Sequence, residues 1–384
     1  MRQFFVVFAV GALAVGQGQS TLADEIRVAQ SAGNYDRAAR LYFQLIAAGN
    51  DSAEVRSNCG IMLHLAGKNR QALEQFRVAL RRNPALAGAN LFAGLAEFDL
   101  GDFRASLPYL QRARELDSNR PTPLLALAKV HLALREYSTA NDCYTKASAM
   151  DSSLTEAWFG MGVTDRSMAD ELLNKAVRNG QANVPTVKDK VQRLLDAALQ
   201  TLSRAIELEP NSARTHLLMA EALSDEGKLA EAVPEYQTAM KLDPALDAAY
   251  LGLASGYWKE RQFDQALPLL EHVLARSPKD PEANGIMADI AEHNGDHTAA
   301  EREAAVALAG NPNLIQTRLV LARVYLAEHR PKLAVNELTK IASADPDGSY
   351  HFLLYRAYRE SGDEATAKSA MAEYLKRRPP PVKP

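Results

Sequence analysis

Cysteine is almost absent from this 384-residue chain, which contains only Cys59 and Cys143. Two cysteines are too few to staple an exported fold with disulfides. In the repeat frame described below, several predicted helices separate them, far beyond the roughly 7 Å between α-carbons that a disulfide spans. We therefore expect Cys59 to be a small core residue, and Cys143 to be either structural or a free thiol.

The chain also lacks an excess of charge of either sign. It has 44 Lys plus Arg and 47 Asp plus Glu, a formal net charge of −3, and the two signs are interspersed. Proteins that bind nucleic acid usually carry a basic footprint for the phosphate backbone. We therefore expect no nucleic-acid partner.

The apolar run at residues 4–15 is too short to cross a membrane, because it has about 12 residues where a spanning helix needs about 20. Arg2 precedes it, and small and polar residues follow, which is typical of a secretory signal. Cleavage after Gly16, Ser20 or Ala23 is possible, and Ala23 is favoured. The alternative is a buried first helix, which the run's lack of a polar face disfavours.

We accordingly predict a signal peptide at residues 1–23. The style of the signal is typical of bacteria. We expect the mature protein to be periplasmic or secreted and to have no stable membrane insertion after signal cleavage.

No motif for catalysis is visible in the sequence. It has no Gly-rich phosphate loop, no Gly-x-Ser-x-Gly elbow and no His-Glu-x-x-His zinc motif. The strongest metal candidates are His293 and His297, near Asp289 and Glu301, but Gly295 falls between them at a predicted turn. We interpret them as solvated turn histidines. The sequence therefore predicts no enzyme, no catalytic residue, no metal site and no cofactor.

Small residues instead recur at intervals of 34 along most of the chain. They are Ala38, Ala72, Ser106 and Ala140, then Ala198, Ala232, Ala266, Ala300 and Ala334. A period of this length is typical of repeated supersecondary units, each too small to bury a hydrophobic face alone. The period therefore predicts a stacked array.

Other positions of a 34-place frame, with Ala53 at place 1, keep their character from unit to unit. Place 8 is small, in Gly60, Gly94, Ala128, Gly162, Ala220, Ala254, Ala288 and Ala322. Place 24 is large and usually apolar, in Tyr42, Phe76, Leu110, Tyr144, Leu202, Tyr236, Leu270 and Leu338. Place 32 is often proline, in Pro84, Pro210, Pro244, Pro278, Pro312 and Pro346. Proline ends a helix, so each unit reads as helix, turn, helix and stop.

This pattern resembles the tetratricopeptide repeat, whose signature has small residues at places 8, 20 and 27 and proline at 32. About ten units begin near Gln19, Ala53, Ala87, Pro121, Thr155, Ala213, Asp247, Pro281, Ile315 and Gly348. The resemblance implies an all-α solenoid, a right-handed superhelix over residues 24–378. Some places depart from the signature: only Trp158 supplies the tryptophan at place 4.

One interruption lies between Ala140 and Ala198, which are 58 residues apart, 24 more than the period. The extra residues, about 166–190, keep helical spacing on both sides of Asn179 and Gly180. They predict one lengthened helical hairpin that projects from the array. It is either a docking arm or hinge, or a tolerated insertion whose apolar residues merely face each other.

The resemblance further implies a concave groove lined by the first helices. In the amino half its places carry an apolar patch that includes Ile61, Leu65, Leu91, Phe92, Leu95, Phe98 and Leu125. In the carboxyl half they carry charged residues that include Arg323, Arg356 and Arg359. These ten are the candidate partner-binding residues. The alternative is that Phe92, Leu95 and Phe98 are packed by neighbouring units.

We therefore predict a non-catalytic scaffold that binds a peptide or helix segment of other proteins, in an envelope or secreted assembly. The alternative is an accessory factor of polysaccharide export or secretion machinery, with a glycan or machine component as ligand. The family's clamp for two carboxylates is not reproduced beyond Asn58. The Pro-rich residues 379–384 are expected to be a disordered tail.

Overall fold

The computed structural model of the chain describes residues 17–179, 184–345 and 347–378. Within these ranges the chain forms twenty α-helices and one 3-10 helix, η1 (Ala342–Ala344), and it contains no strand. The predicted all-α architecture of paired helices is confirmed. Residues 1–16 of the predicted signal and the predicted tail at 379–384 lie outside the described residues.

The helices fall into two compact units, residues 1–164 and residues 165–384, and helix α9 runs across the division. The helices up to the division are α1 (Gln17–Ser31), α2 (Tyr35–Ala47), α3 (Ala53–Leu65), α4 (Asn69–Arg82), α5 (Ala87–Asp99), α6 (Phe103–Leu116), α7 (Thr122–Ala133), α8 (Tyr137–Met150) and α9 (Thr155–Arg178). Those beyond it are α10 (Pro185–Leu208), α11 (Ala213–Asp225), α12 (Leu229–Leu242), α13 (Asp247–Lys259), α14 (Phe263–Arg276), α15 (Pro281–His293), α16 (His297–Gly310), α17 (Ile315–Ala327), α18 (Pro331–Thr339), α19 (Ser349–Glu360) and α20 (Glu364–Arg377).

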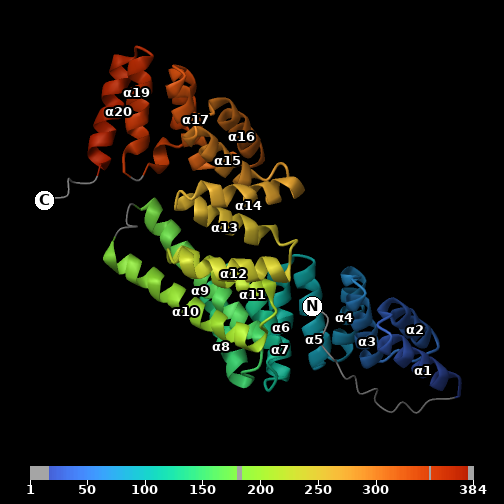
Figure 1. The fold of residues 1–384 in the computed structure, drawn as a ribbon. Helices are drawn as coiled ribbons and strands as arrows, with labels where there is room; N and C mark the ends of the chain where they lie inside the picture. Colours follow the sequence, from blue (N-terminus) through green and yellow to red (C-terminus); the bar gives the residue numbers. More distant parts are fainter. Residues whose placement is uncertain (1–16, 180–183, 346, 379–384) are drawn as a thin grey trace. The chain divides into compact units, whose positions relative to one another are not determined.

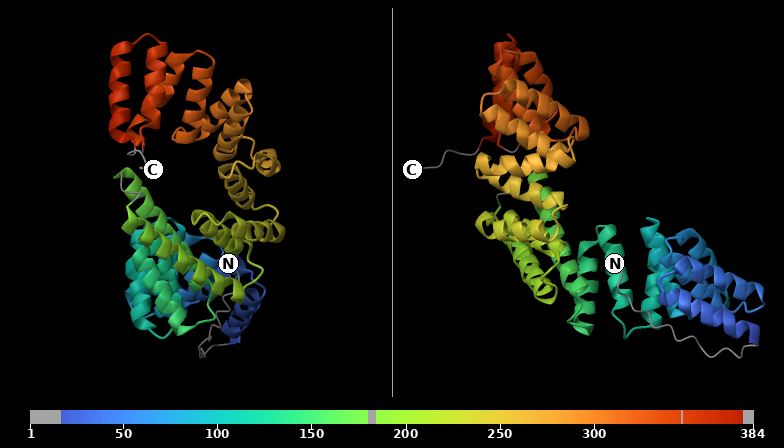
Figure 2. Two further views of the ribbon diagram at one scale, coloured as in Figure 1. Left: turned by 60° about the vertical axis from the view of Figure 1, so that its left-hand side comes forward. Right: turned by 45° about the vertical axis from the view of Figure 1, so that its right-hand side comes forward.

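Consecutive helices pack in pairs, and within each unit the pairs stack in the order of the chain (Figure 1). In the first unit, α3 contacts its partner α4 and also α5 of the next pair, and α5 in turn contacts α7. In the second unit, α11, α13, α15, α17 and α19 contact one another in succession, which can be followed in Figure 2. The first helices of the pairs therefore form one layer within each unit, and this layer is called the first-helix face below.

The turn inside each pair requires a left-handed backbone at place 15. Glycine supplies it in most repeats, as in Gly67 with a φ of 76° and Gly227 with a φ of 77°. Three repeats place a residue with a side chain there, Arg135, Arg261 and His329, with φ of 61°, 58° and 57°. Such residues are strained in this conformation because the β-carbon crowds the following carbonyl. The turn geometry is therefore set by the repeat and overrides the local preference.

The small residue at place 8 makes room for the large residue at place 24 of the same repeat. A β-carbon added to Gly60 would lie 2.6 Å from an atom of the Phe76 ring. One added to Gly94 would lie 2.5 Å from Leu110. Phe76 and Leu110 are fully buried. The two helices of each pair thus approach as closely as the predicted alternation of small and large residues requires.

Place 4 holds a polar residue instead of tryptophan in several repeats, and this residue makes the same hydrogen bond that the tryptophan makes. The indole of Trp158 donates a hydrogen bond to the carbonyl of Ser152, six residues upstream, at 3.0 Å. The same six-residue bond is made to a place-32 carbonyl by Asn90, His216, Asn284 and Arg318, at 3.1, 2.9, 3.2 and 3.1 Å. These bonds satisfy a carbonyl where one repeat ends and the next begins.

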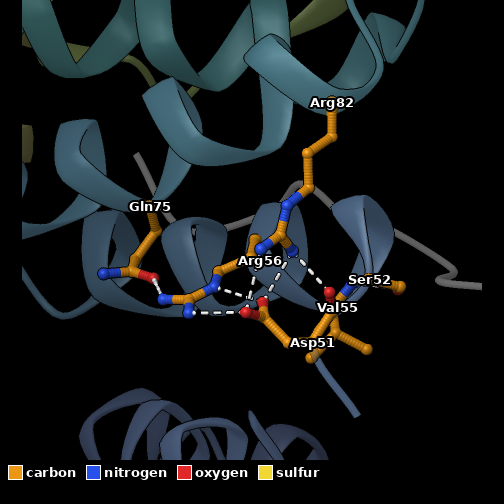
Figure 3. A network of polar contacts seen from close by, with 6 residues as sticks. All are labelled: Asp51, Ser52, Val55, Arg56, Gln75 and Arg82. Carbon is orange, nitrogen blue, oxygen red and sulfur yellow. Dashed lines mark hydrogen bonds and ion pairs between the residues drawn. The ribbon is translucent and has the colours of Figure 1, made fainter. Parts of the chain in front are cut away.

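Place 4 also reaches place 23 of the second helix in three repeats: Arg56 to Gln75, His216 to Glu235 and Arg318 to Glu337. In Figure 3, Arg56 and Arg82 both point at the carboxylate of Asp51, with Nε of Arg56 at 2.6 Å and Nη1 of Arg82 at 2.7 Å. Hydrogen bonds from Arg82 and Arg56 hold the pKa of Asp51 well below its usual range. The network ties the start of α3 to the end of α4.

Helices α9 and α10 are each 24 residues long, whereas the regular helices of the other repeats have mostly 12 to 14. Leu173 on α9 and Val187 on α10 line a common hollow with Asp225. Leu173, Val177 and Val184 remain 42%, 49% and 40% exposed. None of the described helices combines the length and apolar character needed to cross a membrane.

Candidate functional site

The apolar patch predicted for the amino half is largely part of the core. Ile61 and Leu125 are only 2% and 4% exposed, so they cannot anchor a partner without unfolding, and they leave the candidate set. The 34-place frame assigned both residues to the groove because it considers packing against the second helix of the same repeat alone. Helix α3 contacts α2, α4 and α5, however, so more of its circumference is buried.

The remaining apolar candidates are half-buried, with one exception. Leu91, Leu95 and Phe98 pack against the core built around α7 and α8, and Phe92 packs against the core before it. Leu65 alone is 40% exposed. This patch offers partial surfaces of residues whose other sides stabilise the fold.

The first-helix face of the second unit contains a pocket of about 380 Å³, called the acidic pocket below. Five helices line it, α9, α11, α12, α13 and α15. Its charged residues are Arg166 from α9, Glu221 and Asp225 from α11, Lys259 from α13, Glu260 after α13, and Glu282 from α15. Its apolar lining includes Leu229, Tyr236 and Leu251. The pocket therefore combines an apolar lining with a mainly negative rim.

The pocket exists because α13 presents small residues at this face. Gly252, Ser255 and Gly256 line it, and Gly252 and Ser255 stand at places where other repeats have Phe92, Leu95 or Arg323. A β-carbon on Gly252 would lie 2.7 Å from the Tyr236 ring, and one on Gly256 would lie 2.5 Å from Leu229. Close packing of α13 against α12 thus requires both glycines.

Arg166 is hydrogen-bonded to two carboxylates at the pocket. Arg166 donates to Glu221 at 2.7 Å through Nη1 and to Asp225 at 2.7 Å through Nε. Burial raises the pKa of Glu221 even though Arg166 counteracts it, and burial likewise raises the pKa of Asp170. Burial and the neighbouring Asp280 raise the pKa of Glu282. The negative charge of this site is therefore incompletely compensated.

Next to the pocket, charged residues of successive repeats bond to one another. Trp258 Nε1 donates to Asp289 at 2.7 Å, and Arg323 Nη2 donates to Asp289 and Glu292 at 2.7 and 3.0 Å. The Trp258–Asp289 and Glu292–Arg323 bonds join place 12 of one repeat to place 9 of the next, as the Arg166–Glu221 bond does, whereas Asp289 and Arg323 are both at place 9. Arg323, predicted to bind a partner, is thus engaged inside the array.

The other two predicted arginines lie on the last first helix, α19, and both are exposed. Arg359 donates to the hydroxyl of Tyr355 at 3.0 Å, and its guanidinium lies 5.6 Å from the centre of that ring. Phe352 is 39% exposed, and its ring centre lies 6.1 Å from that of Tyr355. Phe352, Tyr355, Arg356 and Arg359 together are called the arginine patch below.

The histidines considered as metal ligands have other neighbours. His293 accepts a hydrogen bond from Arg261 at 3.0 Å and packs edge-on to Phe263, whereas His297 lies 3.8 Å from Glu328. No group of three or more His, Cys, Asp or Glu side chains in the described part of the chain could hold a metal ion.

Both cysteines are unpaired and buried, as expected. Burial raises the pKa of Cys59 to about 12 and also raises the pKa of Cys143. Neither thiol is therefore a reactive thiolate near neutral pH.

Sequence reasoning missed the residues that shape the acidic pocket. Arg166 lies within the region assigned to the insertion, although it occupies place 12 of its repeat. The glycines of α13 fall at places 6 and 10, where the signature makes no demand. The available signal was the run of small residues on the predicted groove face of one helix.

Comparisons with known proteins match this fold. One model described as tetratricopeptide repeat matches residues 24–87, 65–121 and 191–247, and a second of the same description matches residues 223–290 and 257–314. Together the matches cover more than half of the chain. The chain belongs to the tetratricopeptide repeat family, so the predicted resemblance is confirmed. Repeats of this family form protein–protein interaction scaffolds that bind peptide partners, and such proteins are generally non-catalytic.

A curated relative is the TPR repeat-containing protein YpiA of Bacillus subtilis (strain 168), which is 21% identical over 262 residues. The match covers 67% of this chain and 56% of the relative, so the chain spans little more than half of that protein's length. Among solved structures, the human IFIT1 dimer with m7Gppp-AAAA has a TM-score of 0.50 at 17% identity, covering 85% of this chain and 76% of that one. The pilF protein of Pseudomonas aeruginosa has a TM-score of 0.49 at 19% identity, covering 62% and 96%. The likeness to IFIT1 shows the fold alone.

Proposed function

We propose that this chain is a non-catalytic scaffold that holds a segment of a partner protein against the first-helix face of its second unit. The observation that carries the proposal is the hollow over Gly252 and Ser255, where a helix of the array presents no bulky side chain. A partner side chain placed there would contact Tyr236 and Leu251 and would be shielded from water. A few such buried anchors supply most of the energy of a protein interface.

The carboxylates around the pocket support binding rather than catalysis. They surround an arginine that is already bonded to two of them, and neither a histidine nor a cysteine lines the pocket among the described residues. The family assignment points the same way.

The first unit has a secondary place in this proposal. Leu65, Leu91, Phe92, Leu95 and Phe98 retain exposed area on its first-helix face, and they are proposed as a separate contact surface of the first unit. Since most of each side chain stabilises the core, we expect their contribution to binding to be smaller than that of the acidic pocket.

The proposed setting is an envelope or secreted assembly of a bacterial cell, and it rests on the predicted signal. Leu22 on α1 packs against the core of the first unit. Cleavage after Ala23 would remove that contact, whereas cleavage after Gly16 would keep it and would place small residues, Ala14 and Gly16, at the positions that signal peptidase reads. We therefore propose Gly16 in place of Ala23.

The test is affinity capture from the native envelope with wild-type protein and with the variant Ser255→Trp, which fills the hollow. Ser277→Trp, at an exposed turn after α14, is the matched control. We expect the same partners to be captured by wild type and control and to be lost from the Ser255→Trp variant. Capture that Ser255→Trp leaves unchanged, with all three proteins equally helical, would refute the proposed site. Capture of glycan or of export-machinery components would favour the accessory-factor alternative.

A further inference from the structure

We infer that the partner segment carries basic residues at one end and acidic residues about seven to nine residues away. This inference rests on the proposed function, because it describes the ligand of the same first-helix face. It follows from two patches of opposite charge on that face, the acidic pocket and the arginine patch. A largely self-compensated region lies between them.

The acidic pocket selects the basic end. Arg166 and Lys259 stand against four carboxylates in the lining, those of Glu221, Asp225, Glu260 and Glu282. Neither a hydrogen bond nor an ion pair joins the side chain of Glu260 or Glu282 to another described residue, whereas Glu221 and Asp225 share Arg166. A lysine or arginine entering over Ser255 would therefore meet carboxylates of which Glu260 and Glu282 are free of hydrogen bonds and ion pairs to the described residues.

The arginine patch selects the acidic end. Arg356 is exposed and makes no ion pair with the described residues, and Arg359 is bonded to a neutral tyrosine hydroxyl. The nearest acid on the same helix, Glu360, is bonded to His329 at 2.7 Å. Both guanidinium groups thus keep donors for a carboxylate, and the exposed ring of Phe352 offers an apolar contact beside them.

The region between the patches offers little charge to a partner. Arg323 is bonded to both Asp289 and Glu292, and Asp289 also accepts the Trp258 indole N–H. Side chains that already satisfy one another gain little from a new ionic contact. The middle of a bound segment would therefore be read by shape and by apolar contact.

The spacing follows from the stacking of the first helices. Helices α13, α15, α17 and α19 contact one another in succession, which makes three steps from the pocket to the arginine patch. Packed helices lie 8–10 Å apart, so the three steps span roughly 24–30 Å. An extended peptide rises about 3.3 Å per residue, and about seven to nine residues therefore bridge the two patches.

The test uses a library of random dodecapeptides displayed on phage and selected against the immobilised full chain. We expect enriched peptides to carry Lys or Arg toward one end and Asp or Glu toward the other. A selected peptide, synthesised with a fluorescent label, should bind about 5–20-fold more weakly to Glu221→Gln/Glu282→Gln and to Arg356→Gln/Arg359→Gln. The control Glu74→Gln/Arg104→Gln, on exposed positions of α4 and α6, should change the affinity less than 2-fold.

Different experimental outcomes would contradict this inference alone or the proposed function as well. Suppose that Ser255→Trp abolishes binding of the selected peptides but that these peptides show no ordered charge. This result would overturn the inference and leave the proposed binding site standing. Peptides that bind Ser255→Trp as well as wild type would overturn both, as would a selection that enriches none. A pair of glutamine variants that binds like wild type at low ionic strength also overturns the inference, because surface charge contacts are strongest there.

Discussion

Arg166 and Glu221 are joined at 2.7 Å across two repeats that a lengthened hairpin separates in sequence. Their side chains are 25% and 28% exposed, so the pair is partly shielded from water. The same arginine holds Asp225 at 2.7 Å, which makes it the main cationic partner of the acidic pocket. The relationship links the stability of the second unit to the charge of its proposed binding site.

Replacing Arg166 by Gln should therefore destabilise the second unit, because two shielded carboxylates lose their partner. We expect a loss of about 1–3 kcal/mol in the free energy of unfolding at pH 7, measured by urea denaturation. Arg204→Gln removes a more exposed ion pair to Glu207 and should cost less than about 0.5 kcal/mol. Equal losses in the two variants would contradict the special role of Arg166.

The same variant should recover stability as the pH falls. Burial raises the pKa of Glu221 above its ordinary 4.5 and that of Asp170 above its ordinary 3.8. The folded state then takes up protons at a higher pH than the unfolded state does, so these groups penalise folding at neutral pH and the penalty shrinks on acidification. Without Arg166 the pKa values should rise further. The stability difference between variant and wild type should narrow between pH 7 and pH 5, and a widening difference would contradict this account.

Two glycines of adjacent repeats should respond to alanine in opposite directions. Gly60→Ala places a β-carbon 2.6 Å from the Phe76 ring and should cost about 1–3 kcal/mol through overpacking. Gly88→Ala, on α5, meets nothing within 4 Å and should stabilise by up to about 1 kcal/mol, because alanine favours the helix. Thermal melts followed by circular dichroism measure both. A stabilised Gly60→Ala variant would show that the approach of α3 to α4 is looser than described.

The strained turns offer a stabilising substitution. Arg135 has a φ of 61° where Gly67 and Gly101 occupy the equivalent place. Arg135→Gly relieves that strain, although it adds backbone entropy to the unfolded chain and removes a 3.0 Å bond to Tyr137. We expect a net gain of about 0.5–1 kcal/mol, read from the denaturation midpoint. A loss of stability would mean that the side-chain contact outweighs the turn.

The buried ion pair at place 4 gives a double-mutant test. Arg318→Met leaves Glu337, which is 8% exposed, with Lys340 as its remaining cation and removes the bond to Pro312. We expect a loss of about 2–4 kcal/mol. Arg318→Met/Glu337→Met should recover part of it, because no buried charge is then left unpaired. A double variant that is less stable than Arg318→Met alone would refute the coupling.

Most of the fold could be predicted from the period of 34, because the same small and large residues pack together in each repeat. A small residue at place 8 under a large one at place 24, and a helix end at place 32, recur whatever the partner is. The frame could not show that Ile61 and Leu125 are buried, since burial depends on how neighbouring pairs crowd one face. It also could not show that Arg166 meets Glu221, because their contact crosses an insertion that interrupts the period.

The residues that replace tryptophan at place 4 show the same limit of prediction from the signature. Asn90, His216 and Arg318 depart from the expected tryptophan, yet each donates to a carbonyl six residues upstream. The signature records a residue type, whereas the fold requires a donor of sufficient reach. A departure from the signature is therefore no evidence of a weak repeat when the substitute can make the same bond.

The most direct test of the central claim is hydrogen–deuterium exchange of the full chain with and without the captured partner. The account predicts that binding slows exchange in α11, α13, α15 and α19, whose exposed faces carry the acidic pocket and the arginine patch. Protection confined to α3, α5 and α7, or to the extended parts of α9 and α10, would contradict it and would place the partner on another surface.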